Sequence, residues 1–312
     1  MCYNIDDSHK LPQSMKNKLL TLLLLISNIT YGQVSAVVVD SMTKDKIPYV
    51  NIWVENENKG TTSNEHGAFT LNNIENTVVI IFSAIGYETK KVNSELIKNT
   101  IELKSKIIEL QEIVIRPIKH KEETVIGGFE KSKIYYYFSC SGAKPYIVAR
   151  YFEFNENYNQ TPFLKKIRIL TRSRVKDSKF NVRLYSVNKN GEPSDYIYVK
   201  NIIGIARKGK RVTKIDISEL NIKFPENGFF IAIEWLIVES NKHEYTYTMR
   251  GSNKKLVGIS YEPFIGTIPS ETDENSWIFR QGKWSKINKN KSPIKSYKDK
   301  YNPLAIELTL TN

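Results

Sequence analysis

Four aromatic side chains are the residues best suited to bind a ligand. Trp277 and Trp284 flank a predicted turn at Gln281–Gly282 and are the better candidates for exposure, and Tyr245 and Tyr247 complete the set. Exposed aromatic faces can stack on sugar rings, so these four residues are our candidate carbohydrate-binding platform. The alternative is that the same rings pack across neighbouring strands and bind nothing.

A second pattern has the residue types of a metal site. His120 and Glu123 form an H-x-x-E motif, and His243 lies far downstream. Zinc catalysis needs three rigidly held protein ligands, an open coordination position and a general base. Here two of the three residues lie in a charged segment that we expect to be a linker, and short motifs match often by chance. We therefore expect no metal and no cofactor.

Residues 204–210 match the phosphate-binding pattern G-x-x-x-x-G-K, but Arg211 replaces the Ser or Thr that would hold magnesium. The next segment, VTKIDI, is typical of a strand, whereas a phosphate site needs a helix there. We interpret these residues as a basic hairpin tip. The chain has no G-x-S-x-G motif, and Cys140 is expected to be a small buried hydrophobe rather than a catalytic thiol.

Hydrolysis by paired acids is the least favoured alternative. It would require Glu234, Glu262 and Asp273, which are far apart in the sequence, to converge in one cleft. No other group of residues in the sequence indicates a catalytic site, so we predict that the protein is not an enzyme.

Residues 15–32 carry the features of a secretory signal peptide, and we interpret the polar residues 1–14 as lying upstream of the true start at Met15. From Met15 the text MKNKLLTLLLLISNITYGQ has two lysines, an apolar run from Leu19 to Ile29, and small residues before Gln33. About eleven apolar residues are too few for a membrane span of roughly twenty. We predict cleavage after Gly32 and no transmembrane segment in the mature chain. The exported protein would lie in the periplasm, on the outer-membrane surface or outside the cell.

The chain has 312 residues, a formal net charge of +13 and a hydrophobic content of 40 %. This composition is normal for a globular protein, and its length allows two domains. Its basic residues are scattered rather than clustered, which does not favour nucleic acid as a partner. We expect an envelope protein or polysaccharide as the partner.

Short alternating apolar segments between turn residues predict an all-β fold. The segments at 94–99 and 217–222 are at most single helical turns. Residues 117–128 change in composition, with Pro117, a run of charges and Gly127–Gly128, which is typical of a linker. We predict upstream residues and a signal peptide at 1–32, a small seven-stranded sandwich at 33–116, a linker at 117–128, and a larger sandwich at 129–312.

The first predicted sandwich resembles a known family. The segments that carry the resemblance, in order, are Val34–Asp40, Ile47–Ile52, Gly60–Phe69, Ile81–Tyr87 and the closing ELQEIVI. They are similar to the carboxypeptidase-regulatory-like domain, a transthyretin-like (prealbumin-like) Greek-key sandwich frequent in exported proteins of Bacteroidota. One departure is Asn64, where the family usually has Asp. Farther along, FNVRLYSVNKNGEPS and IDISELNIKFPENGFFIAIEWL resemble a jelly-roll module that often follows such domains.

The family domain is non-catalytic, and this resemblance implies structural turn roles for Gly60, Gly67 and Gly86. The stretch GTTSNEHGAFTL is interpreted as a hairpin, with no chemical role for His66. We therefore predict an exported, non-catalytic binding or structural module of the bacterial cell envelope. The alternative is a carbohydrate-binding protein that uses exposed aromatics of the C-terminal sandwich.

Overall fold

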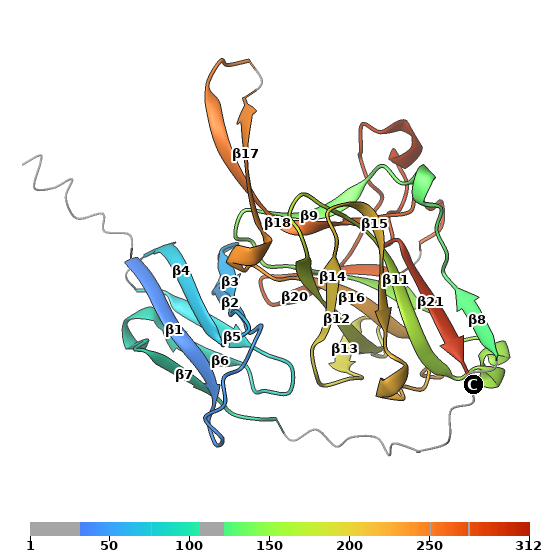
Figure 1. Cartoon of the computed structure of the whole chain (residues 1–312), viewed down its shortest axis with the longest axis horizontal. Coiled ribbons are helices and arrows are strands. Elements are labelled where there is room, and N and C mark those ends of the chain that lie inside the picture. The colour runs from blue at the N-terminus through green and yellow to red at the C-terminus, as the bar shows by residue number, and fades with distance from the viewer. Residues whose placement is uncertain (1–31, 76, 107–121, 250, 274) are drawn as a thin grey trace, which may run out of the picture.

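The computed structural model of the chain describes residues 32–75, 77–106, 122–249, 251–273 and 275–312. These residues form β-strands joined by turns and short 3₁₀ segments, which confirms the all-β prediction (Figure 1). The two predicted single turns are also present, at Ser94–Leu96 and Ser218–Leu220. The predicted signal peptide lies outside the described residues, except for Gly32.

The first sandwich contains seven strands in two sheets, with the orders β4-β1-β7 and β3-β2-β5-β6. Alternating apolar residues on the facing strands, such as Val38, Ile52 and Phe82, are fully buried between them. The closing segment ELQEIVI lies outside the described residues. The strands are β1 (Gly32–Asp40), β2 (Asn51–Val54), β3 (Gly60–Thr62), β4 (Ala68–Ile74), β5 (Val79–Ser83), β6 (Lys90–Asn93) and β7 (Thr100–Leu103).

The predicted hairpin at residues 60–71 is wrong. β3 pairs with β2, whereas β4 pairs with β1 in the other sheet. The turn between β3 and β4 therefore crosses from one sheet to the other. Turn residues and alternation predict two strands and a reversal of the chain, but they do not tell which sheet each strand joins.

The second sandwich consists of two sheets of seven strands each. One has the order β13-β12-β16-β10-β19-β20, with β14 also paired to β12. The other has the order β17-β18-β11-β21-β8, with β15 paired to β11 and β9 to β18. The strands are β8 (Glu123–Ile126), β9 (Tyr137–Ser141), β10 (Ile147–Phe152), β11 (Phe163–Ser173), β12 (Ser178–Val187), β13 (Pro193–Tyr196), β14 (Ile202–Ala206), β15 (Gly209–Asp216), β16 (Phe229–Trp235), β17 (Lys242–Thr248), β18 (Lys255–Gly266), β19 (Ser276–Arg280), β20 (Lys283–Lys286) and β21 (Ile306–Thr311).

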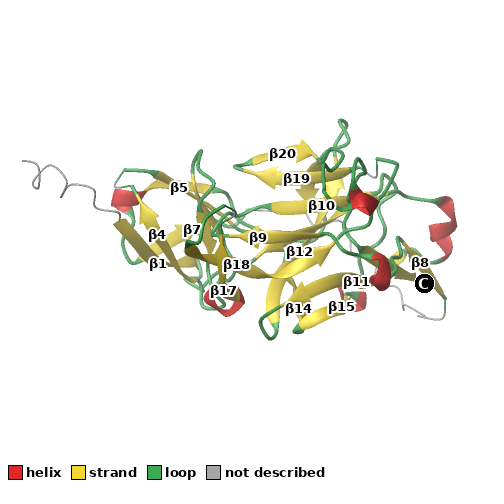
Figure 2. Ribbon diagram, turned by 90° about the horizontal axis from the view of Figure 1, so that it is seen from above, coloured by secondary structure: helices red, strands yellow, loops and turns green. Residues whose placement is uncertain are grey.

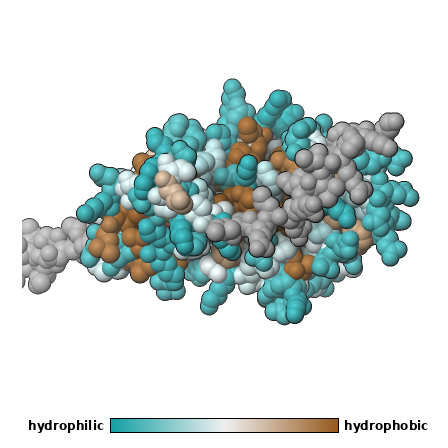
Figure 3. Space-filling model, turned by 90° about the horizontal axis from the view of Figure 1, so that it is seen from below, coloured by the Kyte–Doolittle hydropathy of each residue, from teal (hydrophilic) through white to brown (hydrophobic). Residues whose placement is uncertain are grey.

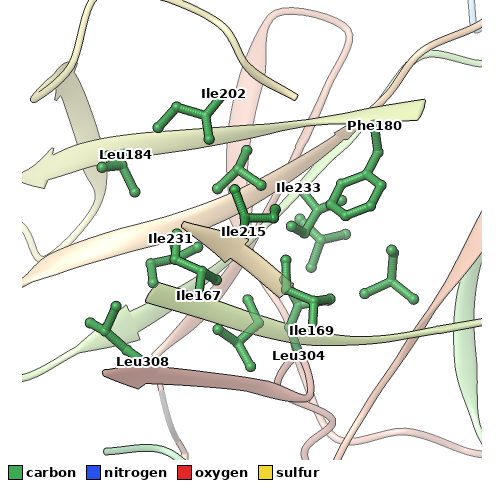
Figure 4. Close-up of a cluster of buried hydrophobic side chains, with 14 of the residues drawn as sticks. Ile167, Ile169, Phe180, Leu184, Ile202, Ile215, Ile231, Ile233, Leu304 and Leu308 are labelled. Carbon is green, nitrogen blue, oxygen red and sulfur yellow. The ribbon is translucent and has the colours of Figure 1, made fainter. Parts of the chain in front are cut away.

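The main core of the second sandwich lies between its two sheets. Figure 4 shows side chains from both sheets gathered there, among them Ile167 of β11, Ile231 of β16 and Leu308 of β21. Every residue of β16 is buried, because this strand lies in the middle of its sheet. The jelly-roll assignment of this sandwich stays a prediction.

The predicted linker is shorter than residues 117–128. Residues 117–121 lie outside the described residues, but Glu123–Ile126 form β8, which pairs with the C-terminal strand β21. Pro117 and Gly127–Gly128 suggested a linker, although a short strand lies between them. The partner of this strand is almost two hundred positions away in the sequence, and composition does not reveal such a distant pairing.

The basic segment at residues 204–210 is a tight connection rather than a hairpin tip. β14 pairs with β12 in one sheet and β15 pairs with β11 in the other, so this segment also joins the two sheets. As at residues 60–71, the local pattern located the reversal correctly but assigned the wrong partners.

The two sandwiches contact each other (Figure 2). The backbone N–H of Gly60 donates to the carbonyl of Ala143 at 2.8 Å. Thr62 and Ile237 are joined twice, by Thr62 N to Ile237 O at 3.2 Å and by Ile237 N to Thr62 Oγ1 at 3.0 Å. Strand β3 of the first sandwich thus bonds to the segment that follows β16 in the second.

Candidate binding surface

The four predicted ligand-binding aromatics lie on two different sheets. Trp277 is on β19 and Trp284 on β20, at one edge of the sheet that contains β16. Tyr245 and Tyr247 are on β17, at the edge of the opposite sheet. The four residues therefore do not form one platform, and each pair is described by itself.

Trp277 is 9 % exposed, so the prediction that it is exposed is wrong. Its indole Nε1 donates to Asn275 Oδ1 at 2.8 Å. Trp284 is half-buried, with its ring 5.5 Å from that of Tyr185 and 5.2 Å from that of Phe279. Cross-strand packing explains this pair, because β10 and β12 place further apolar rings on the same outer face.

Tyr245 and Tyr247 lie on a projecting hairpin, which is formed by β17 and the first half of β18 (Figure 1). They are 37 % and 46 % exposed. His243, Tyr245 and Tyr247 share one face of β17, because successive side chains alternate between faces. The ring centroids are 6.2 Å apart between His243 and Tyr245, and 6.0 Å apart between the two tyrosines. We call these three residues the ring row.

The ring row is held in place by its strand partner. Gly258 lies directly opposite Tyr245, and a Cβ atom added to Gly258 would come within 2.6 Å of the tyrosine ring. The tyrosine ring therefore packs over Gly258, and a larger residue at position 258 would displace the ring. The face of the molecule seen in Figure 3 is mostly hydrophilic, with separate hydrophobic patches. An exposed row of ordered rings on a projecting strand is a favourable contact surface.

A buried carboxylate lies at the base of this hairpin. Glu262 accepts a hydrogen bond from Ser260 Oγ at 3.3 Å and pairs with Arg174 Nη1 at 3.5 Å. Burial raises the pKa of Glu262 above its ordinary value, and the positive charge of Arg174 opposes that shift. The carboxylate thus helps to fix the position of Arg174 next to the ring row.

Arginines and rings alternate from the ring row across the sheet. The Cζ atom of Arg174 lies 5.8 Å from the ring centroid of Tyr245 and 5.0 Å from that of Phe264. The Cζ atom of Arg172 lies 5.2 Å from Phe264 and 4.8 Å from Tyr137. All four distances are within the range of cation–π attraction. We call these five residues the arginine ladder.

Sequence patterns did not identify Arg172 and Arg174 as site residues. A signal was available, since residues two apart on a strand share a face, and ILTRSR places two guanidinium groups on the same side. Their aromatic partners come from β9, β17 and β18, which are distant in the sequence. No local pattern predicts that these strands lie side by side.

The turn glycines of the first sandwich have backbone roles. Gly67 has φ +72°, and a Cβ atom there would lie 2.7 Å from the carbonyl oxygen of Val38. Gly86 also has a positive φ, of +81°. Asn64 accepts hydrogen bonds from the backbone N–H groups of His66 and Ala68, at 2.9 and 3.0 Å, as the turn prediction expected.

Gly60 serves close approach rather than a turn. It begins β3 and does not have a left-handed φ. A Cβ atom at this position would lie 2.4 Å from both the Ile52 carbonyl oxygen and Pro145 Cγ. Pro145 belongs to the second sandwich, so this glycine allows the two sandwiches to come together.

The fold and these turns agree with a known domain family. Residues 34–115 match the CarboxypepD_reg-like domain. The match covers the first sandwich, as the sequence resemblance predicted. The CarboxypepD_reg-like domain is compatible with a binding or structural module.

Most of the chain aligns with solved structures at low identity and low TM-score. The cysteine protease and lectin-like domains of Cwp84, a surface layer associated protein of Clostridium difficile, are 11 % identical; the likeness covers 90 % of this chain and 59 % of that one, with a TM-score of 0.35. The VP2 subviral particle of infectious bursal disease virus is 9 % identical, with 84 % and 60 % covered and a TM-score of 0.25. The chain spans less than two thirds of the length of either structure. No curated protein sequence matches it.

The three acids of the hydrolase alternative have separate partners. Glu234 pairs with Arg183, Glu262 with Arg174, and Asp273 with Lys286. Cys140 is fully buried, as predicted, and burial raises the pKa of its thiol to about 12. At neutral pH this thiol is protonated and cannot act as a thiolate nucleophile.

The residues of the H-x-x-E pattern are also separated. Glu123 pairs with Lys165 on β11, His243 stacks on Tyr245, and His120 lies outside the described residues. Across the described parts of the chain, no three His, Cys, Asp or Glu side chains come together as a metal-binding group. A helix with the length and apolar character needed to cross a membrane is likewise absent from those parts.

Proposed function

We propose that the protein is an exported, non-catalytic binding module of the bacterial cell envelope. In this proposal the second sandwich binds the partner through the ring row, and the CarboxypepD_reg-like domain supports it. The observation that carries the proposal is the exposure of Tyr245 and Tyr247 as neighbouring rings on a projecting hairpin. Rings that are already ordered lose little conformational entropy when a partner covers them.

Export is supported by residues 15–32, whose lysines, short apolar run and small residues follow the pattern of a signal peptide. A non-catalytic role is supported by the separation of the candidate acids and by the buried, protonated thiol of Cys140. The partner would be an envelope protein or a polysaccharide.

Carbohydrate binding is the second candidate, and the exposed tyrosines favour it. Aromatic faces bury large apolar areas against flat ligands, and tyrosine also offers a hydroxyl group to a polar ligand. The buried Trp277 has little exposed surface for this role. If a sugar binds, we expect the contact at Tyr245 and Tyr247 and not at the Trp277 edge.

The test compares binding of purified full-length mature protein to envelope fragments of the source bacterium. The double variant Tyr245→Ser/Tyr247→Ser should bind at least about tenfold more weakly, since each lost ring contact contributes on the order of 1 kcal/mol. Val257→Ser is the matched control, because Val257 is an exposed apolar residue on the opposite face of the same hairpin. Its binding should equal that of the wild type.

Two treatments of the envelope fragments identify the partner class. Loss of binding after protease digestion indicates a protein, and loss after periodate oxidation indicates a saccharide. If the tyrosine double variant binds as well as Val257→Ser, the ring row is not the binding surface and the proposal is wrong.

A further inference from the structure

Three basic residues gather at the end of the arginine ladder that Arg172 forms. Arg172 on β11 lies directly opposite Lys210 on β15, and both side chains point to the outer face of the sheet. Lys131 is close enough to act on Lys210 electrostatically. We call Lys131, Arg172 and Lys210 the basic cluster.

The basic cluster has no ion-pair partner in the described part of the chain. Among the described residues, no carboxylate forms an ion pair with Lys131, Arg172 or Lys210. Burial lowers the pKa of Lys210, and the charges of Lys131 and Arg172 lower it further. Like charges held together without a counter-charge repel each other, so an anion bound among them would be stabilised.

The groups of the cluster are ordered and still have hydrogen-bond donors to offer. Lys210 Nζ donates to the Ile134 carbonyl at 2.8 Å and lies 5.6 Å from the ring centroid of Tyr135. An ammonium group has three N–H donors, so two remain. The guanidinium of Arg172 stacks between Tyr137 and Phe264, and no described residue accepts a hydrogen bond from it. Stacking uses its faces and leaves the donors at its edge.

The basic cluster is continuous with the ring row. The strands β17, β18, β11 and β15 are consecutive neighbours in one sheet. At about 4.8 Å between strands, they span on the order of 14 Å. The arginine ladder crosses the first three of these strands, from Tyr245 on β17 to Arg172 on β11, and Lys210 lies on the fourth. Ring faces and uncompensated positive charges therefore lie along a single strip.

We propose that this strip binds an acidic polysaccharide, with sugar rings on Tyr245 and Tyr247 and sugar carboxylates on Arg172 and Lys210. The proposal rests on the proposed function, whose binding surface it extends and whose ligand class it names. A guanidinium fork fits a carboxylate with two parallel hydrogen bonds, and the tyrosine faces suit the rings between carboxylates. Nucleic acid is less well matched, because its charge recurs about every 3.4 Å along each strand and the strip offers few uncompensated cations.

The probe is polygalacturonate, a soluble polymer of acidic sugars, used with the full-length mature protein. The wild type should bind it, and the affinity should fall with added salt. The fully methyl-esterified polymer has the same rings without the charges, and it should bind at least about tenfold more weakly, because the charge-assisted hydrogen bonds are lost.

The variant Lys131→Gln/Lys210→Gln removes two charges from the cluster and leaves the arginine ladder intact. Its affinity for polygalacturonate should fall about tenfold, through the loss of charge-assisted contacts. The matched control Lys223→Gln/Lys286→Gln removes two charges elsewhere, from residues paired with Glu226 and Asp273. It should bind like the wild type.

Equal weakening in both double variants would show a general charge effect and overturn the proposal. The proposal would also be overturned if polygalacturonate did not bind. Tighter binding to single-stranded DNA or to anionic phospholipid vesicles than to polygalacturonate would overturn it as well. These failures differ from failure of the proposed function. In each of them, envelope binding that depends on Tyr245 and Tyr247 could still be intact.

Discussion

Replacing Glu234 by glutamine tests how the two sandwiches are held together. Glu234 is on β16, and its Oε2 atom accepts hydrogen bonds from Arg183 Nη2 at 2.6 Å and Nε at 2.9 Å. Its Oε1 atom accepts a hydrogen bond from Asn51 Nδ2, in the CarboxypepD_reg-like domain, at 3.1 Å. The carboxylate therefore joins a buried ion pair of one sandwich to a side chain of the other.

The expected cost follows from burial. The side chains of Arg183 and Glu234 are 2 % and 5 % exposed, so solvent hardly screens them. Removing one partner of such a pair leaves an uncompensated buried charge, which costs about 3–5 kcal/mol. The glutamine has nearly the same shape, so the loss reports on charge rather than on a cavity. Asn51→Ala removes only one hydrogen bond to the carboxylate and should cost about 1–3 kcal/mol.

The assay is urea unfolding of the full-length mature protein, followed by circular dichroism and tryptophan fluorescence. Asp273→Asn is the matched control, because its ion pair with Lys286 is partly exposed and should contribute less than about 1 kcal/mol. Replacing Arg183 and Glu234 together by methionine should recover most of the lost stability, since no buried charge remains. If the free energy of unfolding of Glu234→Gln is within about 1 kcal/mol of the wild-type value, the charge of Arg183 is not buried without compensation in the variant, and the reasoning is wrong.

Three further predictions concern single positions. Cys140, with its raised pKa, should not react with iodoacetamide at pH 8 until the chain is unfolded, as measured by mass spectrometry; stoichiometric labelling of the folded protein would contradict its burial. Gly67→Ala should destabilise the first sandwich by about 1–3 kcal/mol, because the glycine has a positive φ. His66→Ala, on the exposed turn, should change the free energy of unfolding measured by thermal denaturation by no more than about 0.5 kcal/mol. Amino-terminal sequencing of the exported protein should begin at Gln33, and recovery of an intact Met15 would count against the signal peptide.

The strand content and the first domain could be predicted from the sequence because both depend on local patterns. Turn residues such as Gly67, Asn64 and Gln281–Gly282 mark reversals, and the last pair has positive φ at both positions, as a two-residue hairpin turn requires. Strand partners could not be predicted in the same way. The segments 60–71 and 204–210 each join two sheets, although each looks like a hairpin, because the partner of a strand is set by distant residues.

The candidate site could also be predicted only in part from the sequence. The sequence favoured Trp277 and Trp284 as the exposed rings, whereas the exposed pair in the structure is Tyr245 and Tyr247, on an edge strand. Trp277 flanks a turn in a similar polar context, yet it is buried by residues of β10, which is more than a hundred positions earlier in the sequence. Exposure of a large side chain depends on what covers it, and the covering residues are not its neighbours in the chain.

The contacts between the sandwiches give the CarboxypepD_reg-like domain a structural role in presenting the ring row. The segment that leads from β16 into β17 is bonded on one side by Thr62 of the first sandwich, through both its backbone and its hydroxyl group. On the other side, Asn241 donates from its amide to the carbonyls of Leu236 and Lys179 and accepts from Lys179 N. A projecting hairpin transmits any rotation at its base to its tip, so fixing this segment fixes the direction of the ring row. The first domain therefore limits the orientations of a hairpin that it does not itself form, which in the proposed function is its contribution to binding.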